Sequence, residues 1–325
     1  MPQDTSRTVY YKRAKFDDGV THTLQQLLGS ALNTQKHIAD RSEAVDAAAT
    51  ELRVITYHTT SGNFIHGRLN TYKKGAYQSV IDDNPTATVL PLHAAKPPKQ
   101  GTQQQEWVAG TVYFTVHKNH LIISQSIALR ATGLEQHLVW LFRSRLQLMT
   151  TGQSLALVDE QPKATKARIR KAHVTNMQLS RSLMDEHVVK AKNGKEVTKF
   201  KVADEALSWL EKISGGAISK MDLEGKVFDS NLEVWVGLSY PHKQRAKPKD
   251  AVKLMDDLAI ALRDIDEDEA RLQLSDGSVV EGKELKIRAP VETTVTDGVL
   301  DETELFKGMR EYLTNLISSQ QIEPN

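Results

Sequence analysis

The sequence predicts an α+β protein of two domains, with mixed or antiparallel sheets and packed helices. A chain of 325 residues is long for one compact core, so two domains are expected. Several short segments alternate apolar and polar residues, as strands do, whereas others repeat apolar residues at helical spacing. Neighbouring strand segments follow one another with few crossovers, which favours α+β over a parallel sheet. We expect an N-terminal α+β domain over residues 1–150 and a C-terminal α+β domain over residues 151–325.

The clearest hairpin and helix lie in residues 107–148. Residues 108–117 and 120–126 read as two strands joined by a two-residue turn at Lys118-Asn119. A helix is expected from Thr132, which has capping-box spacing to Glu135. Its apolar stripe is Leu134, Leu138, Leu141, Phe142 and Leu146.

The rest of the first half adds strands and one long helix. Residues 84–105 contain four prolines and a run of glutamines, so we expect this segment to be mostly irregular. A turn at Ser61-Gly62-Asn63 separates two of the strands. The expected strands are residues 8–12, 52–58 and 64–72, and the expected helix is residues 20–32.

The second half alternates strands and helices of more polar character. Residues 164–175 read as an extended basic strand, and Asn193-Gly194 is a strong hairpin turn inside residues 187–201. The last helix has a wide apolar stripe from Leu305 to Ile317, which suggests self-association. The second half starts at residues 153–158, a further strand is expected at 232–240, and strand-like pieces are expected within 271–287 around the Asp276-Gly277 turn. Helices are expected at 204–213, 250–265 and 301–317, the last capped by Asp301 and Glu304.

Composition excludes several classes of protein. The chain has no cysteine, which excludes disulfides, thiolate zinc sites and a cysteine nucleophile, and suits a reducing cytoplasm. The first residues have no apolar signal core, and no apolar run approaches the length of a bilayer span. We therefore expect a cytoplasmic protein, for which any membrane role needs a partner.

The first basic cluster lies in a stretch that is far from neutral, although the whole chain has a formal charge of only +1. Residues 161–201 contain 11 Lys or Arg against three acids, a net charge of +8. In a strand, Lys166, Arg168 and Arg170 would project from one face and could follow a phosphate backbone. The alternative is a solvated strand face. The densest cations are Lys163, Lys166, Arg168, Arg170 and Lys171.

The second basic cluster is a proline-stiffened loop between a strand and a helix. The free N–H groups and the positive dipole end of that helix favour a phosphate, and arginine can bind one with two donors. The alternative is a basic surface loop balanced by the acids of residues 255–269, which carry a net charge of −6. The cations of this loop are Lys243, Arg245, Lys247 and Lys249.

The residues that could support enzymatic chemistry are a weaker indication of function than the two basic clusters. His117 and His120 flank a turn, but no third ligand has convincing spacing for a metal. Asp222, Glu224 and Lys226 alternate like the carboxylates and lysine of a metal-dependent nuclease, yet the run contains a glycine and reads equally well as a turn. No phosphate loop, dinucleotide fingerprint or nucleophile elbow is present. We expect a non-catalytic protein without cofactor or metal.

The second half also resembles a known family. The run from Asp222 to Val234, then a strand, the basic loop and an amphipathic helix, is similar to the RexA-like family of phage-exclusion proteins. The similarity continues through Arg271-Leu272, an Asp-Gly turn and the terminal helix, and more loosely through the first half. The chain departs from it at residues 84–105 and near Asn193.

The resemblance implies a DNA-binding homodimer that acts in phage exclusion, or abortive infection, as an antiviral defence with a membrane channel protein as effector. The cations from Lys243 to Lys249 match the family's basic run. Together with the charge argument, this predicts a largely sequence-independent double-stranded DNA-binding protein that acts as a sensor. A metal-dependent nuclease and a protein–protein interaction module with a basic docking loop remain the alternatives.

Overall fold

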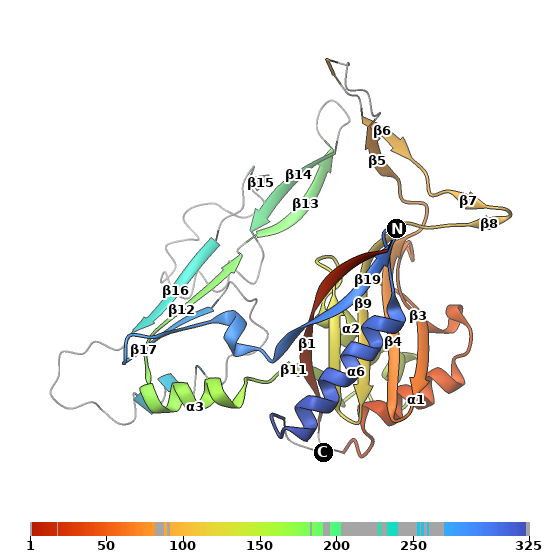
Figure 1. Ribbon diagram of the computed structural model, residues 1–325. Helices are drawn as coiled ribbons and strands as arrows, with labels where there is room; N and C mark the ends of the chain where they lie inside the picture. Colours follow the sequence, from red (N-terminus) through yellow and green to blue (C-terminus); the bar gives the residue numbers. More distant parts are fainter. Residues whose placement is uncertain are drawn as a thin grey trace. The chain divides into compact units, whose positions relative to one another are not determined.

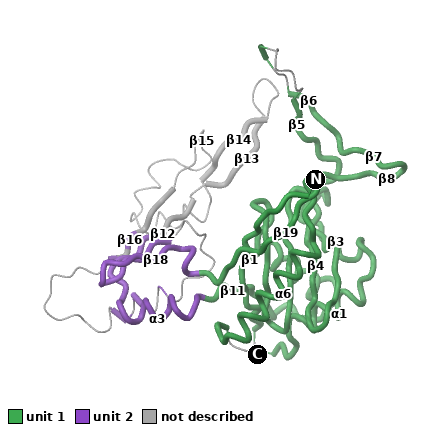
Figure 2. The backbone as a smooth tube through the Cα atoms, viewed as in Figure 1, with its two compact units in different colours: residues 1–160, 286–325 green, residues 161–285 purple. Residues whose placement is uncertain are grey.

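In the computed structural model, the chain forms two compact units (Figure 2). Unit 1 comprises residues 1–160 and 286–325, and unit 2 comprises residues 161–285. The structure describes residues 2–17, 19–81, 88–89, 92–182, 184–190, 196–202, 227–228, 233–239, 252–253, 255–256, 259 and 270–322. The α+β class is confirmed. The first boundary lies at residue 160 and not at 150, and residues 286–325, which were expected in the C-terminal domain, belong to unit 1.

Unit 1 is built on a curled sheet of nine strands in its described part, with the order β2-β3-β4-β9-β10-β1-β19-β20 and with β11 also paired to β1 (Figure 1). All of its pairs are antiparallel. The strands are β1 (Gln3–Phe16), β2 (Ser42–Ala44), β3 (Glu51–Ser61), β4 (Phe64–Lys73), β9 (Val108–His117), β10 (His120–Gln125), β11 (Leu155–Asp159), β19 (Arg288–Thr296) and β20 (Val299–Leu300). The helices are α1 (Leu24–Thr34), η1 (Ile38–Arg41), α2 (Ala131–Val139), the π-helical η2 (Trp140–Arg145) and α6 (Glu302–Ser318).

The predicted turn at Lys118-Asn119 is confirmed. His117 and His120 face one another across the hairpin, and Lys118 has a φ of 52°, a left-handed conformation that closes the two-residue turn. The turn at Gly62, which has a φ of 57°, likewise joins β3 to β4. Sequence alternation and turn residues were therefore sufficient to place the centre of the sheet.

The predicted capping box of α2 is wrong. The helix begins at Ala131, its N-cap Arg130 makes no side-chain capping bond, and Glu135 instead accepts a hydrogen bond at 2.6 Å from the backbone N–H of Leu157. A tertiary contact to β11 thus takes the carboxylate that the local motif would have used. Capping-box spacing alone does not decide between these partners.

The two faces of the sheet are buried under different helices. On one face, α1, α2 and η2 pack on the apolar side chains of β4, β9 and β10. On the other, α6 covers Val9, Tyr11 and Ile122 (Figure 1). Its apolar stripe from Leu305 to Leu316 is thereby buried within unit 1. The stripe that suggested self-association is not an exposed surface.

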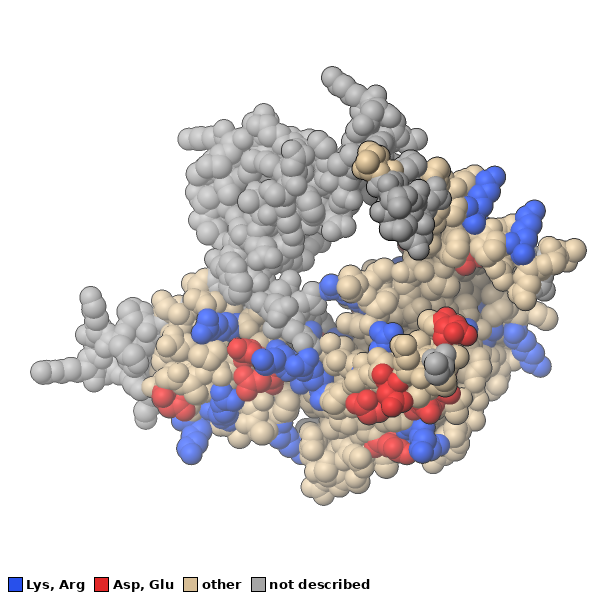
Figure 3. Space-filling view, turned by 45° about the horizontal axis from the view of Figure 1, so that its top comes forward, with Lys and Arg blue, Asp and Glu red and all other residues tan. Residues whose placement is uncertain are grey.

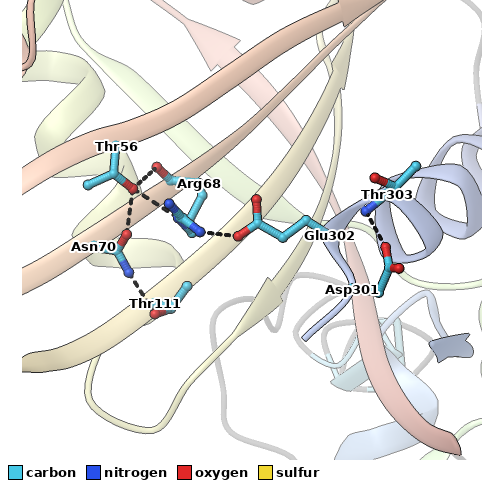
Figure 4. A network of polar contacts seen from close by, with 7 residues as sticks. All are labelled: Thr56, Arg68, Asn70, Thr111, Asp301, Glu302 and Thr303. Carbon is cyan, nitrogen blue, oxygen red and sulfur yellow. Dashed lines mark hydrogen bonds and ion pairs between the residues drawn. The ribbon is translucent and has the colours of Figure 1, made fainter. Parts of the chain in front are cut away.

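Polar contacts fix the start of α6 against the sheet (Figure 4). Asp301 caps the helix by accepting hydrogen bonds from the backbone N–H groups of Thr303 and Glu304, so the predicted N-terminus is confirmed. Glu302 in the first turn forms an ion pair with Arg68 of β4, and Arg68 Nε donates to Thr56 Oγ1 at 2.9 Å. The helix is therefore positioned by charge at its start and by apolar packing along its length.

Residues 84–105, expected to be mostly irregular, contribute to two short hairpins that extend from the end of β4 (Figure 1). The first pairs β5 (Gln78–Ile81) with β6 (Leu92–Ala95), and the second pairs β7 (Lys99–Gln100) with β8 (Gln103–Gln104). The prolines do not prevent this, because Pro97 and Pro98 lie between the hairpins. The prediction for this segment was wrong in its described part.

Unit 2 contains two small antiparallel sheets and the helix α3 (Lys163–Ala172). One sheet has the order β16-β12-β17-β18, and the other has the order β13-β14-β15. The strands are β12 (Val174–Ser182), β13 (Met184–Lys190), β14 (Glu196–Val202), β15 (Val227–Phe228), β16 (Glu233–Ser239), β17 (Ala270–Leu274) and β18 (Val279–Glu281), followed by the short η4 (Gly282–Leu285). The paired β13 and β14 confirm the predicted hairpin, whose turn lies outside the described residues.

Candidate nucleic-acid interface

The first basic cluster lies on a helix, not on the strand that was predicted. Residues 163–172 form α3, and the strand begins only at Val174. Alanine, lysine and arginine are strong helix formers, so the composition of this segment favours the helix. His173, with a φ of 59°, ends α3, and its ring Nδ1–H donates a hydrogen bond to Asp256 Oδ2 at 2.7 Å.

The helical spacing separates the three cations that a strand would have aligned. Side chains two positions apart on a helix point about 200° apart, so Arg168 cannot share a face with both Lys166 and Arg170. Arg168 points back onto unit 2, where Nη1 donates to Glu284 Oε1 at 2.8 Å and Nη2 donates to the carbonyl oxygen of Val279 at 2.6 Å. It is a packing residue that a carboxylate neutralises, and its assignment to a phosphate-binding row was wrong.

The remaining cations of α3 lie toward solvent. Thr165 and Ile169 are buried and define the inner face of the helix. The opposite face carries exposed alanines at positions 164 and 167, with cations around them. Lys163, Arg170 and Lys171 are exposed, and Lys166 is half-buried at the margin of this face. We call Lys163, Lys166, Arg170 and Lys171 the α3 cationic face.

The acids near this helix already have partners. Hydrogen bonds from Ser278 lower the pKa of Asp276, and the ammonium group of Lys283 lowers the pKa of Glu281. Glu284 binds Arg168, and Asp256 accepts hydrogen bonds from His173 and the backbone N–H of Val174. These are the acids of unit 2 whose side chains are described, and none of them makes a recorded ion pair with Lys166, Arg170 or Lys171. These three cations of the face therefore keep their charge.

Blue and red side chains both appear on the described surface of unit 2 (Figure 3). In this view they are interspersed, and they do not form one unbroken basic patch. The charge is local to α3, in agreement with the near-neutral total of the chain. A polyanion would meet a short cationic helix face, not a broad basic surface.

The second basic cluster cannot be placed. Lys243, Arg245, Lys247 and Lys249 lie outside the described residues, as do Asp222, Glu224 and Lys226 of the nuclease alternative. The acidic residues 264–269 also lie outside them. The binding of phosphates by this loop therefore stays a prediction.

The histidines that suggested a metal have other roles. His120 is buried, and its Nδ1 lies 2.8 Å from the hydroxyl of Tyr11, whereas His117 Nδ1 lies 2.9 Å from the carbonyl oxygen of Asn63. In the part of the chain that the structure describes, no group of three His, Asp or Glu side chains could hold a metal ion. The same part contains no helix that is both long and apolar enough to cross a membrane.

Comparison with known proteins assigns no family. No protein-family model matches the chain, and no curated protein matches it significantly. Arguments about function therefore depend on the residues of this chain.

Proposed function

We propose that this protein binds double-stranded DNA through the phosphates, largely without sequence preference, and that the α3 cationic face is a contact surface. The observation that supports this proposal is the grouping of four cations on the outer side of one helix. The described acids nearby are engaged by residues other than Lys166, Arg170 and Lys171. Four such cations are a suitable complement for a backbone of closely spaced negative charges.

The dimensions of α3 suit a contact with a duplex. Ten residues make a helix about 15 Å long, which is long enough to reach several phosphates. The small side chains of Ala164 and Ala167 allow the helix backbone to approach the nucleic acid closely. Because the exposed face offers only cations and alanines, its contacts position the protein and carry little sequence information.

A salt titration tests the proposal. If the α3 cationic face neutralises four phosphates, the logarithm of the binding constant falls with the logarithm of salt concentration with a slope of about −3.6. That slope is a loss of roughly 150-fold in affinity between 50 and 200 mM salt. Fluorescence anisotropy with a labelled duplex would measure it. A salt-independent affinity would reject binding through phosphates.

A charge-matched pair of variants locates the surface. The test variant is K166Q/R170Q/K171Q, in which glutamine keeps the helix propensity of α3. The control is K36Q/K73Q/K74Q, which removes the same charge from exposed positions of unit 1. We expect the test variant to lose most of its affinity on every duplex sequence, and the control to bind much as the wild type does. Equal losses would indicate a non-specific effect of net charge.

Competition and metal ions separate the alternatives. Duplex, single-stranded and RNA competitors should compete unequally, with the duplex strongest. Incubation of duplex with Mg²⁺ or Mn²⁺ should leave it intact, whereas cleavage would favour the nuclease alternative at Asp222 and Glu224. Binding to an acidic protein, without any binding to DNA, would favour the interaction module.

The biological role is part of the same proposal and depends on the resemblance to RexA-like proteins. In that role a cytoplasmic homodimer senses DNA and signals to a membrane effector that excludes phage. Sedimentation of the full chain would measure its mass, and plaque counts with K166Q/R170Q/K171Q would test the link to DNA. A monomer would contradict the homodimer, and unchanged exclusion by a variant that cannot bind DNA would contradict the sensor role.

A further inference from the structure

His173, at the end of α3, is held by a buried carboxylate and yet is open to solvent. Its ring Nδ1–H donates a hydrogen bond to Asp256 Oδ2 at 2.7 Å, and the backbone N–H of Val174 donates to Asp256 Oδ1 at 2.8 Å. The side chain of Asp256 is only 10% exposed, whereas that of His173 is 45% exposed. Because a carboxylate only accepts hydrogen bonds, this contact fixes the proton of the neutral ring on Nδ1 and leaves the lone pair on Nε2.

A second histidine–carboxylate pair, in unit 1, is closed to solvent. His137 Nδ1 lies 3.0 Å from Glu43 Oε2, but the His137 side chain is completely buried, and its Nε2 atom has no hydrogen-bond partner in the described chain. Nε2 of His173 is not among such buried atoms, and no described residue binds it. The lone pair of His173 Nε2 is therefore free and can be reached by a small molecule.

The backbone of His173 adopts a conformation that favours glycine. Its φ is 59° and its ψ is 141°, a combination that residues with a Cβ atom rarely adopt. The backbone N–H of Ser275 holds this turn by donating to the carbonyl oxygens of Ala172 and His173, at 3.1 and 2.9 Å. A glycine would remove the strain, but it would also remove the imidazole. Strain of this kind is concentrated at functional sites.

We propose that His173 accepts a phosphoryl group on Nε2 from a donor with a phosphorus–nitrogen bond, of which phosphoramidate is the simplest. The Nε2 lone pair attacks the phosphorus atom, and the bond from phosphorus to the protonated amine breaks. The amine leaves with that electron pair as neutral ammonia. The ring gains a positive charge, which Asp256 stabilises through the Nδ1–H bond while the proton stays on Nδ1.

The charge around His173 suits the phosphorylated product. Arg170 and Lys171, in the last turn of α3, are exposed and make no recorded ion pair with a described residue. A phosphoryl group adds close to two negative charges, which neighbouring cations favour. Asp276, in the adjacent turn, already accepts hydrogen bonds from Ser278. The proposal goes beyond DNA binding and does not depend on it, because the transfer needs only the imidazole, its carboxylate and the donor.

Labelling of the full chain with phosphoramidate tests the proposal. Mass spectrometry at neutral pH would follow the phosphoryl group on each histidine over time, since the bond to histidine breaks in acid. The reference histidines are His22 and His37, which are exposed and have no carboxylate partner in the described chain. We expect His173 to react about tenfold faster than these, the effect of one charge-assisted hydrogen bond that strengthens during the transfer. A rate at His173 no higher than at the reference histidines would overturn the proposal, and this comparison needs no variant.

Three variants assign the effect to the carboxylate. Asp256→Asn keeps a hydrogen-bond acceptor but removes the charge, so it should lower the rate at His173 to that of the reference histidines. Asp256→Glu restores the charge and should recover part of the rate, which a purely structural role would not explain. Glu43→Gln, the matched control, removes the charge from the buried pair with His137 and should leave the rate at His173 unchanged. An unchanged rate in Asp256→Asn, or an equal loss in Glu43→Gln, would overturn the role of Asp256.

Discussion

The guanidinium of Arg168 donates a hydrogen bond to the carboxylate of Glu284 at 2.8 Å, and this pair connects α3 to η4. Thr165 donates to the backbone carbonyl of the same Glu284 at 2.9 Å, so two successive inward positions of the helix bind one residue. Arg170 lies only two positions from Arg168 but on the exposed side of α3. Two arginines that look equivalent in the sequence therefore have different roles.

The first prediction separates these roles. Arg168→Gln should lower the free energy of unfolding of unit 2 by about 1 kcal/mol, because the pair is partly exposed and solvent screens it. It should leave the affinity for a duplex nearly unchanged. Arg170→Gln should weaken that affinity by about fivefold, the effect of one charged contact, and leave stability unchanged. Urea unfolding would measure the change in stability, and fluorescence anisotropy would measure the change in affinity. If Arg168→Gln weakened DNA binding and Arg170→Gln lowered stability, the roles given to the two arginines would be wrong.

Much of the fold of unit 1 could be predicted from the sequence. The hairpin at Lys118-Asn119 and the helix capped by Asp301 are set by local chemistry, namely a turn and a side-chain cap, and both are confirmed. The return of residues 286–325 to unit 1 could not be predicted. It depends on β19 pairing with β1 along eight residue pairs, which are far apart in the sequence.

The candidate site was harder to predict because its residues fit both the two-residue repeat of a strand and the 3.6-residue repeat of a helix. With cations at 166, 168 and 170, the segment alternates as a strand does. The signal for a helix was the helical spacing of Thr165, Ile169 and Ala172, together with the alanines, lysines and arginines that fill the other positions of the segment.

The second prediction concerns Gly308, which lies in α6 against β19. A Cβ atom at this position would lie 2.3 Å from Cγ1 of Val291. Alanine is the better helix former by about 1 kcal/mol, but the clash should outweigh this. Gly308→Ala should therefore destabilise unit 1 by about 1–3 kcal/mol. Asn315→Ala, at an exposed position of the same helix, should stabilise it slightly; a gain for both variants would contradict the close packing.

The third prediction concerns the buried carboxylate of Asp159 at the end of β11. Lys12 Nζ lies 2.8 Å from Asp159 Oδ2, and Lys286 Nζ lies 3.9 Å from the same atom. Both contacts are ion pairs, and their geometry is not that of a hydrogen bond. Asp159→Asn removes the buried negative charge that faces both lysines, so we expect a loss of about 3–5 kcal/mol. Glu160→Gln, next to it, breaks the longer and more exposed contact with Arg13 and should cost less than about 1 kcal/mol. Chemical unfolding of both variants tests the contrast, and similar losses would show that burial of Asp159 is not decisive.

The fourth prediction is a dependence of stability on pH that arises from two buried histidines. Burial, with smaller contributions from nearby cations, lowers the pKa of His66 and that of His120 from 6.5 to about 4. Between pH 6.5 and 4 the unfolded chain therefore binds more protons at these sites than the folded chain does, so stability falls as the pH falls through this window. Below pH 4 both states are protonated and the loss is complete. Each histidine can contribute at most about 3 kcal/mol.

Urea midpoints measured from pH 7.5 to 4.5 would test this for the wild type and for His66→Gln/His120→Gln. Carboxylates also titrate near the lower end of this range, so the informative quantity is the difference between the two proteins. We expect the variant to be less stable at pH 7.5, because it loses the contacts to Thr115 and Tyr11, but to lose less stability on acidification. His22→Gln/His37→Gln, which replaces two exposed histidines, should follow the wild type. A variant that loses as much stability as the wild type between pH 6.5 and 4.5 would show that the buried rings are not the groups responsible.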